Sequence, residues 1–352
     1  MSVKQRKFGW DFVKFILMFL IVYGHFCPSG ESWTPVTRII GLCSIPGFFF
    51  VSGYFQSRIT TCSDLFNKYR KTLMRIVVPM LSWGVIYVVL SLIQQFLSRE
   101  ISDVYDIIQF LKYSPYYIAG IYWFLTALLF CILIGSMLSW MIYENKLLGL
   151  LLTAVCPICF CFVSPLLMEH YHFSFIWFFY VAGMLYKQKG TLLNQKIQIP
   201  WYLLFIILFI IVVIGVQFKP QLTFYYTANI IGITPLRFVV YRYVLCLIAT
   251  ISVIYGIFLF YDRYRGLQVV TTFASYGIDT LFIYCSHVLV LLFLYRPFIL
   301  PYLYHEHAGW FVCIVEHVVG LVASFLIYYL MQKICLYGKQ FRWLRMFLMG
   351  TK

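Results

Sequence analysis

A carboxylate, an amine and an imidazole lie within one apolar stretch near the start of the chain, at Asp11, Lys14 and His25. Lys14 and His25 are eleven residues apart, about three turns of an α-helix, so both fall on one face, roughly 16 Å apart along its axis. Asp11 precedes Lys14 by one turn and is placed to pair with it. Histidine titrates near neutral pH and suits general-base chemistry on a hydroxyl group. The alternative is that Lys14 reaches the lipid headgroups and His25 is an interface histidine with a structural role.

The elements that position these groups must be membrane helices. Of the 352 residues, 62% are hydrophobic and 11% are charged, whereas a soluble domain has about 45–50% apolar and about 25% charged residues. The net charge of +15 does not indicate nucleic-acid binding, because the 27 Lys and Arg residues form short clusters beside apolar runs. We therefore predict an all-α, polytopic transmembrane helix bundle. It is expected to be a single domain over residues 1–352, without a separate soluble domain and without a nucleic-acid partner.

Ten segments are apolar over about the 20 residues that a membrane-spanning helix requires. With Lys and Arg enriched on the cytoplasmic side, an N-in, C-in topology places 19 of the 27 inside, 7 outside and Lys14 within a span. The expected spans are 8–27, 36–56, 74–97, 117–143, 147–164, 173–186, 199–216, 239–261, 274–298 and 309–332.

The spacing of Asp11, Lys14 and His25 resembles the opening helix of the integral-membrane acyltransferase family 3, whose members O-acylate surface glycans. Further stretches resemble motifs of that family in the same order and extend the resemblance to about residue 295. The fucose 4-O-acetylase-like branch is the most similar in character. These stretches are IPGFFFVSGYF at 45–55, RIVVP at 75–79, YWFL at 122–125 and YCSH at 284–287.

The resemblance implies an O-acyltransferase of the bacterial inner membrane, acting among membrane lipids. It would move an acyl group, expected to be acetyl, from acetyl-coenzyme A in the cytoplasm to a hydroxyl of a surface polysaccharide or lipid-linked glycan. His25 is the expected catalytic base. Direct transfer and relay through an acyl-enzyme both remain open.

Basic residues near the inner end of the third span are expected to hold the donor, because its phosphates require cations. Arg70, Lys71 and Arg75 form this cluster, and we expect Lys14 to face the same vestibule. Many members of the family carry an R-x-x-R pair here, but Thr72 stands at the first position. The alternative is that these cations only set the orientation of the chain.

Glu31, Glu169, Trp123 and His287 are expected to line the acceptor site, although Trp123 also suits an aromatic belt at the membrane interface. We predict no metal site, because the two His-x-His pairs at 170–172 and 305–307 lack a scaffold of carboxylates or cysteines. A glycolipid or polysaccharide transporter or flippase is the main alternative function, and a non-catalytic sensor or scaffold is a third.

Overall fold

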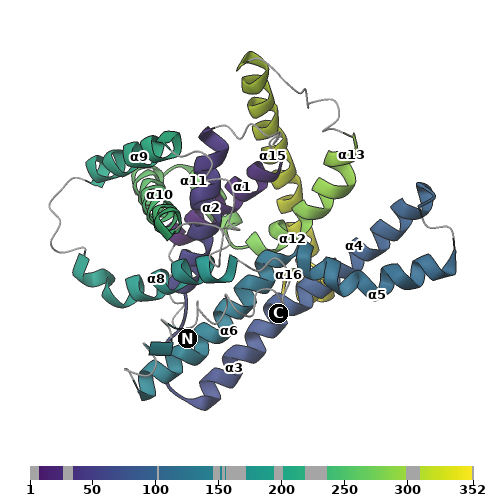
Figure 1. The fold of residues 1–352 in the computed structure, drawn as a ribbon, viewed down its shortest axis with the longest axis horizontal. Coiled ribbons are helices and arrows are strands. Elements are labelled where there is room, and N and C mark those ends of the chain that lie inside the picture. The colour runs from purple at the N-terminus through teal and green to yellow at the C-terminus, as the bar shows by residue number, and fades with distance from the viewer. Residues whose placement is uncertain are drawn as a thin grey trace.

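The fold is helical in every regular element that the computed structural model describes (Figure 1), as the sequence predicts. It describes residues 8–26, 35–100, 103–145, 151, 152, 155, 172–193, 201–218, 236–298 and 310–350. The helices are α1 (Phe8–Phe26), α2 (Pro35–Tyr54), α3 (Cys62–Thr72), η1 (Leu73–Val77), α4 (Val78–Leu97), α5 (Val104–Ile121), α6 (Trp123–Glu144), α8 (His172–Leu193), α9 (Trp201–Phe218), α10 (Leu236–Tyr264), α11 (Gln268–Tyr276), α12 (Thr280–Val290), η4 (Leu291–Tyr295), α13 (Arg296–Phe298), α15 (Trp310–Gly338) and α16 (Arg342–Met349).

Six helices of the described part are long and apolar enough to cross a membrane, and two shorter ones, Phe175–Lys187 and Phe205–Gln217, are also apolar. The expected fifth span, 147–164, lies almost wholly outside the described residues. The protein is therefore an integral-membrane helix bundle by length and composition. The six are Phe8–Phe26, Cys62–Leu97, Trp123–Tyr143, Val240–Tyr264, Thr280–Phe298 and His317–Gly338.

Two of the expected spans are wrong at their boundaries, because the chain breaks within them. The segment 117–143 is divided at Tyr122, where α5 ends and α6 begins. The segment 274–298 is divided between Tyr276 and Thr280, so α12 starts later than predicted. At this second break Gly277 lies so close to α1 that an added Cβ would meet the carbonyl oxygen of Asp11. Hydropathy alone does not detect such breaks, since both sides of each are apolar.

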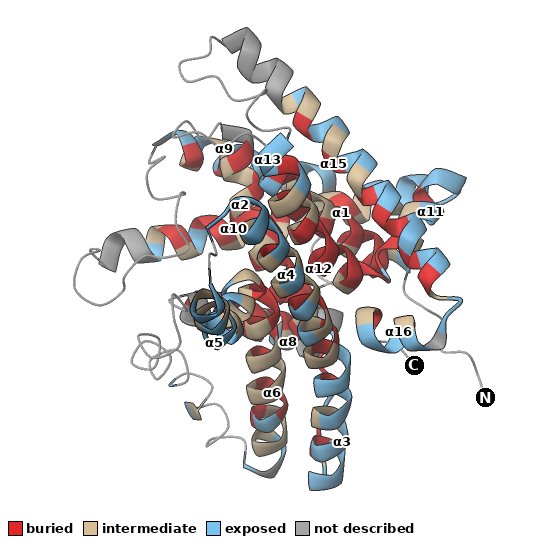
Figure 2. Ribbon diagram, turned by 90° about the vertical axis from the view of Figure 1, so that its right-hand side faces the viewer, coloured by how far each residue is buried: buried red, intermediate tan, exposed pale blue. Residues whose placement is uncertain are grey.

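The best-buried helices, α1, α2 and α12, lie at the centre of the bundle (Figure 2). A reciprocal pair of glycines lets α2 pack closely on α8. A Cβ on Gly53 would meet the carbonyl oxygen of Tyr180, and one on Gly183 would meet that of Phe50. Close approach of this kind is how membrane helices associate without a hydrophobic driving force. Gly53 of the SGY motif therefore serves helix packing.

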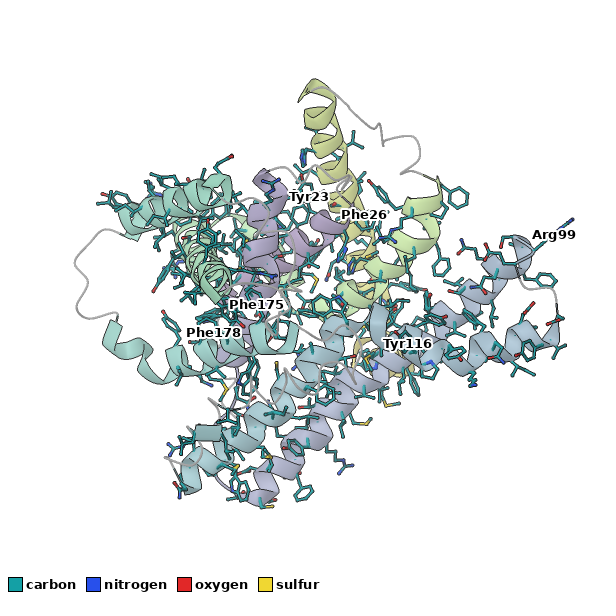
Figure 3. All side chains as sticks on the ribbon, viewed as in Figure 1. Tyr23, Phe26, Arg99, Tyr116, Phe175 and Phe178 are labelled. Carbon is teal, nitrogen blue, oxygen red and sulfur yellow. The ribbon has the colours of Figure 1, made fainter. Side chains whose placement is uncertain are left out.

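Aromatic contacts extend the core toward the edge of the bundle. Phe175 and Phe178 project from α8 toward α10 (Figure 3), where their ring centroids lie 5.0 and 5.4 Å from that of Tyr243. At the opposite edge of the bundle, Arg99 ends the turn that follows α4 and has a φ of 59°. Its side chain points away from the other helices (Figure 3). The packed centre, rather than these edges, therefore positions the candidate site.

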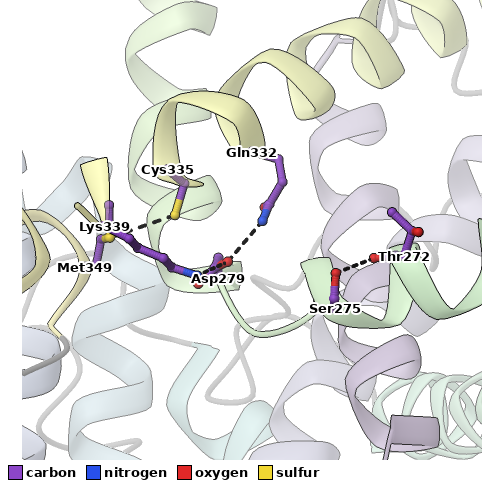
Figure 4. A network of polar contacts seen from close by, with 7 residues as sticks. All are labelled: Thr272, Ser275, Asp279, Gln332, Cys335, Lys339 and Met349. Carbon is purple, nitrogen blue, oxygen red and sulfur yellow. Dashed lines mark hydrogen bonds and ion pairs between the residues drawn. The ribbon is translucent and has the colours of Figure 1, made fainter. Parts of the chain in front are cut away.

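A buried polar network joins the start of α12 to the end of α15 (Figure 4). Asp279 is 7% exposed and accepts hydrogen bonds from Lys339 Nζ at 2.6 Å and from Gln332 Nε2 at 3.0 Å. Both donors satisfy a carboxylate that burial would otherwise penalise. The network therefore holds the first turn of α12, the helix that carries His287, against α15.

Candidate functional site

The first helix holds Asp11 and Lys14 as the spacing predicts. Lys14 Nζ lies 3.1 Å from Asp11 Oδ1 in an ion pair whose carboxylate is buried. The same ammonium lies 4.5 Å from the centroid of the Phe55 ring. Carboxylate and ring orient the amine, while part of the side chain stays accessible from an adjoining cavity. The pairing of Asp11 with Lys14 is confirmed.

A cavity of about 480 Å³ lies between α1, α2, α3, α6 and the start of α12. Apart from basic side chains, its lining is largely apolar and aromatic, and includes Phe124 and Tyr284. Neither Asp nor Glu is among its described lining residues, so the charge it presents is positive. This combination suits a ligand with an anionic end and a slender, less polar end. Four basic side chains line it: Lys14, Lys68, Lys71 and Arg75.

Three of these cations form a helical stripe, because Lys68, Lys71 and Arg75 are separated by three and four residues. Lys68 also lies within range of electrostatic repulsion from Lys71 and Arg75. Clustered like charges destabilise a structure unless an anion joins them. The sequence analysis missed Lys68, although its place on this stripe was a signal that could have identified it.

Arg75 lies in the π-helical turn η1, where the backbone departs from regular α geometry. Pro79 follows it by four residues and has no N–H to donate to the Arg75 carbonyl, as a regular helix would require. Gly350, which follows α16 and has a φ of 62°, packs against this same carbonyl. Such π-helical turns often occur at functional sites. The R-x-x-x-P pattern thus has a local structural reason for its proline.

The two histidines of the predicted site lie together. The ring centroids of His25 and His287 are 5.3 Å apart, although 261 other residues separate them in the chain. His287 is fully buried, its Nδ1 lies 3.1 Å from the Ile283 carbonyl oxygen, and its Nε2 has no hydrogen-bond partner among the described residues. That carbonyl can only accept, so a neutral His287 carries its proton on Nδ1 and leaves Nε2 as an acceptor.

A chain of ring contacts connects the cavity to His25. The Tyr284 ring lines the cavity, and its centroid lies 5.4 Å from that of His287, which in turn contacts His25. His25 itself is exposed and is not among the described lining residues of the cavity. Lys14 and His25 therefore mark two separate regions of α1, and the rings of Tyr284 and His287 connect the cavity that Lys14 lines to His25.

The other predicted site residues lie outside the described lining of the cavity or outside the described residues. Arg70 is exposed and absent from the described lining residues, so Lys71 rather than Arg70 lies beside Arg75 in the cavity. Trp123 is half-buried and packs on Phe124, with ring centroids 6.2 Å apart, outside the described lining. Glu31 and Glu169 lie outside the described residues.

Comparison with known proteins identifies the family of the chain. The model of a family described as an acyltransferase domain, acyltransferase family 3, matches residues 7–332. The chain belongs to this family. The resemblance is thereby confirmed across nearly the whole chain, while the fucose 4-O-acetylase-like branch stays a prediction.

One curated relative is the nodulation protein NolL of Sinorhizobium fredii (strain NBRC 101917 / NGR234). It is 26% identical over 205 residues, which cover 55% of this chain and 54% of that protein. The chain thus spans about half the length of the curated relative it matches. No solved structure matches the chain.

Proposed function

We propose that this protein is a membrane O-acyltransferase that moves an acetyl group from acetyl-coenzyme A to a hydroxyl of a surface polysaccharide or lipid-linked glycan. The cavity lined by four basic side chains and by apolar and aromatic residues supports this proposal. Its cations suit the phosphates of the donor, and its apolar lining suits the long, thin pantetheine arm. Tyr284 lines this cavity, its ring contacts that of His287, and the His287 ring contacts that of His25.

The proposed topology has ten spans with both termini in the cytoplasm, in a bacterial inner membrane. It follows from the excess of Lys and Arg on one side of the chain. Under this topology Lys68, Lys71 and Arg75 lie at the cytoplasmic face, where acyl-coenzyme A is found. His25 is then at the opposite end of α1, close to an acceptor that arrives from the other side.

In the proposed reaction His25 acts as the general base. It takes the proton of the acceptor hydroxyl as the oxygen attacks the thioester carbonyl carbon. The carbon–sulfur bond then breaks, the acetyl group stays on the acceptor oxygen, and coenzyme A leaves as a thiolate that takes up a proton. No cysteine is among the described lining residues of the cavity, which supports direct transfer over an acyl-enzyme relay.

The test is transfer of labelled acetyl from acetyl-coenzyme A to candidate glycan acceptors in membranes that contain the protein. Loss of a general base lowers rates by about 10²–10⁴-fold, so His25→Ala should reduce transfer by at least about a hundredfold. His317→Ala is the matched control, because His317 bonds Tyr23 at 2.6 Å outside the proposed site. Undiminished transfer by His25→Ala, with normal amounts of inserted protein, would remove His25 from the mechanism.

A further inference from the structure

A second hollow of about 560 Å³ adjoins the basic cavity, and Gln56 lines both. It is formed by the segment after α2 and by the C-terminal parts of α6 and α8. In the proposed topology all of these lie on the cytoplasmic side. Its described lining residues are Gln56, Ser57, Arg58, Ser139, Ile142, Tyr143, Met184 and Lys187.

Gln56 forms a fixed boundary between the two spaces. It is buried, its Oε1 accepts from Tyr180 at 2.9 Å, and its Nε2 donates to Ser136 Oγ at 2.9 Å. Lys187 Nζ donates to the Gln56 main-chain oxygen at 2.9 Å, which uses one of its three N–H groups. Among the described residues the ammonium makes no other hydrogen bond, so it is held at the edge of the hollow with two donors left for a ligand.

Arg58 and Tyr143 supply a second cation and a planar ring. The guanidinium carbon of Arg58 lies 5.0 Å from the Tyr143 ring centroid, and both side chains are exposed. Guanidinium groups bind phosphates through paired hydrogen bonds, and nucleobases stack on aromatic rings. The described lining residues of the hollow include no carboxylate. A phosphate joined to a planar base matches this set better than a phosphate alone.

The two spaces are also linked by charge. Lys68 of the basic cavity lies within range of electrostatic repulsion from Lys187 of the second hollow. A ligand with several phosphates would relieve repulsion in both at once. Ligand sites usually enclose about 300–1,000 Å³, and the basic cavity, at about 480 Å³, is small within that range for a ligand with both a nucleotide and a long arm.

We propose that the second hollow binds the nucleotide end of the acyl donor, with the 3′-phosphate on Arg58 and Lys187 and the adenine ring on the face of Tyr143 opposite Arg58. The basic cavity then holds the diphosphate and the pantetheine arm. This inference rests on the proposed function for the identity of the donor. It adds a binding site on α6 and α8, away from both histidines.

The experiment measures equilibrium binding to the purified full chain in nanodiscs of neutral phosphatidylcholine. The probes are coenzyme A, dephospho-coenzyme A, which lacks the 3′-phosphate, and adenosine 3′,5′-bisphosphate. We expect Arg58→Ala and Lys187→Ala to weaken coenzyme A binding about tenfold each, the effect of losing one hydrogen bond to a charged group, and to abolish its advantage over dephospho-coenzyme A. Tyr143→Leu should weaken both by a similar factor. Lys333→Ala is the control, because Lys333 also lies over a tyrosine ring, 5.3 Å from Tyr329, but lines neither space.

The outcomes separate this inference from the proposed function. Unchanged binding by the Arg58 and Lys187 variants, or a wild-type protein that binds none of the three probes, overturns the inference. Binding of adenosine 3′,5′-bisphosphate that these variants weaken supports the nucleotide site even if no acetyl transfer is found. If phosphatidylglycerol in the nanodiscs displaces the bisphosphate from the wild type but not from the two variants, the hollow takes a lipid phosphate and the inference is overturned.

Discussion

Replacement of Arg75 by alanine tests whether the cations of the basic cavity hold a ligand or only orient the chain. The guanidinium is exposed within a cavity whose described lining residues include no carboxylate. A hydrogen bond to a charged group contributes about 1.5–3 kcal/mol, and about 1.4 kcal/mol corresponds to a factor of ten. Lys68 and Lys71 remain in Arg75→Ala, so we expect the low end of that range, an increase of about tenfold in KM for acetyl-coenzyme A.

The assay is acetyl transfer in membranes with the donor varied at saturating acceptor. Because Arg75 lines the cavity and His25 is not among its described lining residues, kcat and the KM for the acceptor should change little. Arg70→Ala is the matched control, since Arg70 is exposed and five residues earlier but does not line the cavity. An unchanged donor KM in Arg75→Ala, or an equal increase in Arg70→Ala, would refute the reasoning and leave both residues as determinants of topology.

Two further predictions concern how the helices that carry the site are held. In Gly183→Ala the new methyl group would meet the Phe50 carbonyl oxygen, so α2 and α8 must separate. We expect a loss of stability of about 1–3 kcal/mol, seen as a lower melting temperature in detergent. An unchanged melting temperature would contradict this packing. Lys339→Ala leaves Asp279 buried with only Gln332 as a described side-chain partner and should cost about 1–3 kcal/mol. The double variant with Asp279→Asn should recover part of that loss, and no recovery would contradict the role of the charge.

Much of the fold could be predicted because its signal is local. Runs of apolar residues predicted helices that the structure has in most of the expected spans. The breaks at Tyr122 and Gly277 could not be predicted, because they depend on packing between helices. Gly277 packs on the backbone of Asp11, which lies far away in the chain.

The candidate site was predictable to the extent that its residues share one helix. Asp11 and Lys14 pair because they are one turn apart. Lys68, Lys71 and Arg75 form a stripe for the same reason, yet which cations of α3 face a cavity depends on the helices that surround it. Arg70 belongs to the same short segment and does not line the cavity.

The sequence by itself determined that this protein is a helical membrane bundle of an acyltransferase family, because composition, apolar periodicity and short ordered motifs are properties of the chain alone. The tertiary structure alone decided that His287 lies against His25, that Tyr284 stands between this pair and four cations, and that a second hollow adjoins the first. The physical reason is that each of these three features brings together helices that are far apart in the chain. Whether such helices touch depends on where small residues let them approach. A hydropathy pattern does not record that approach.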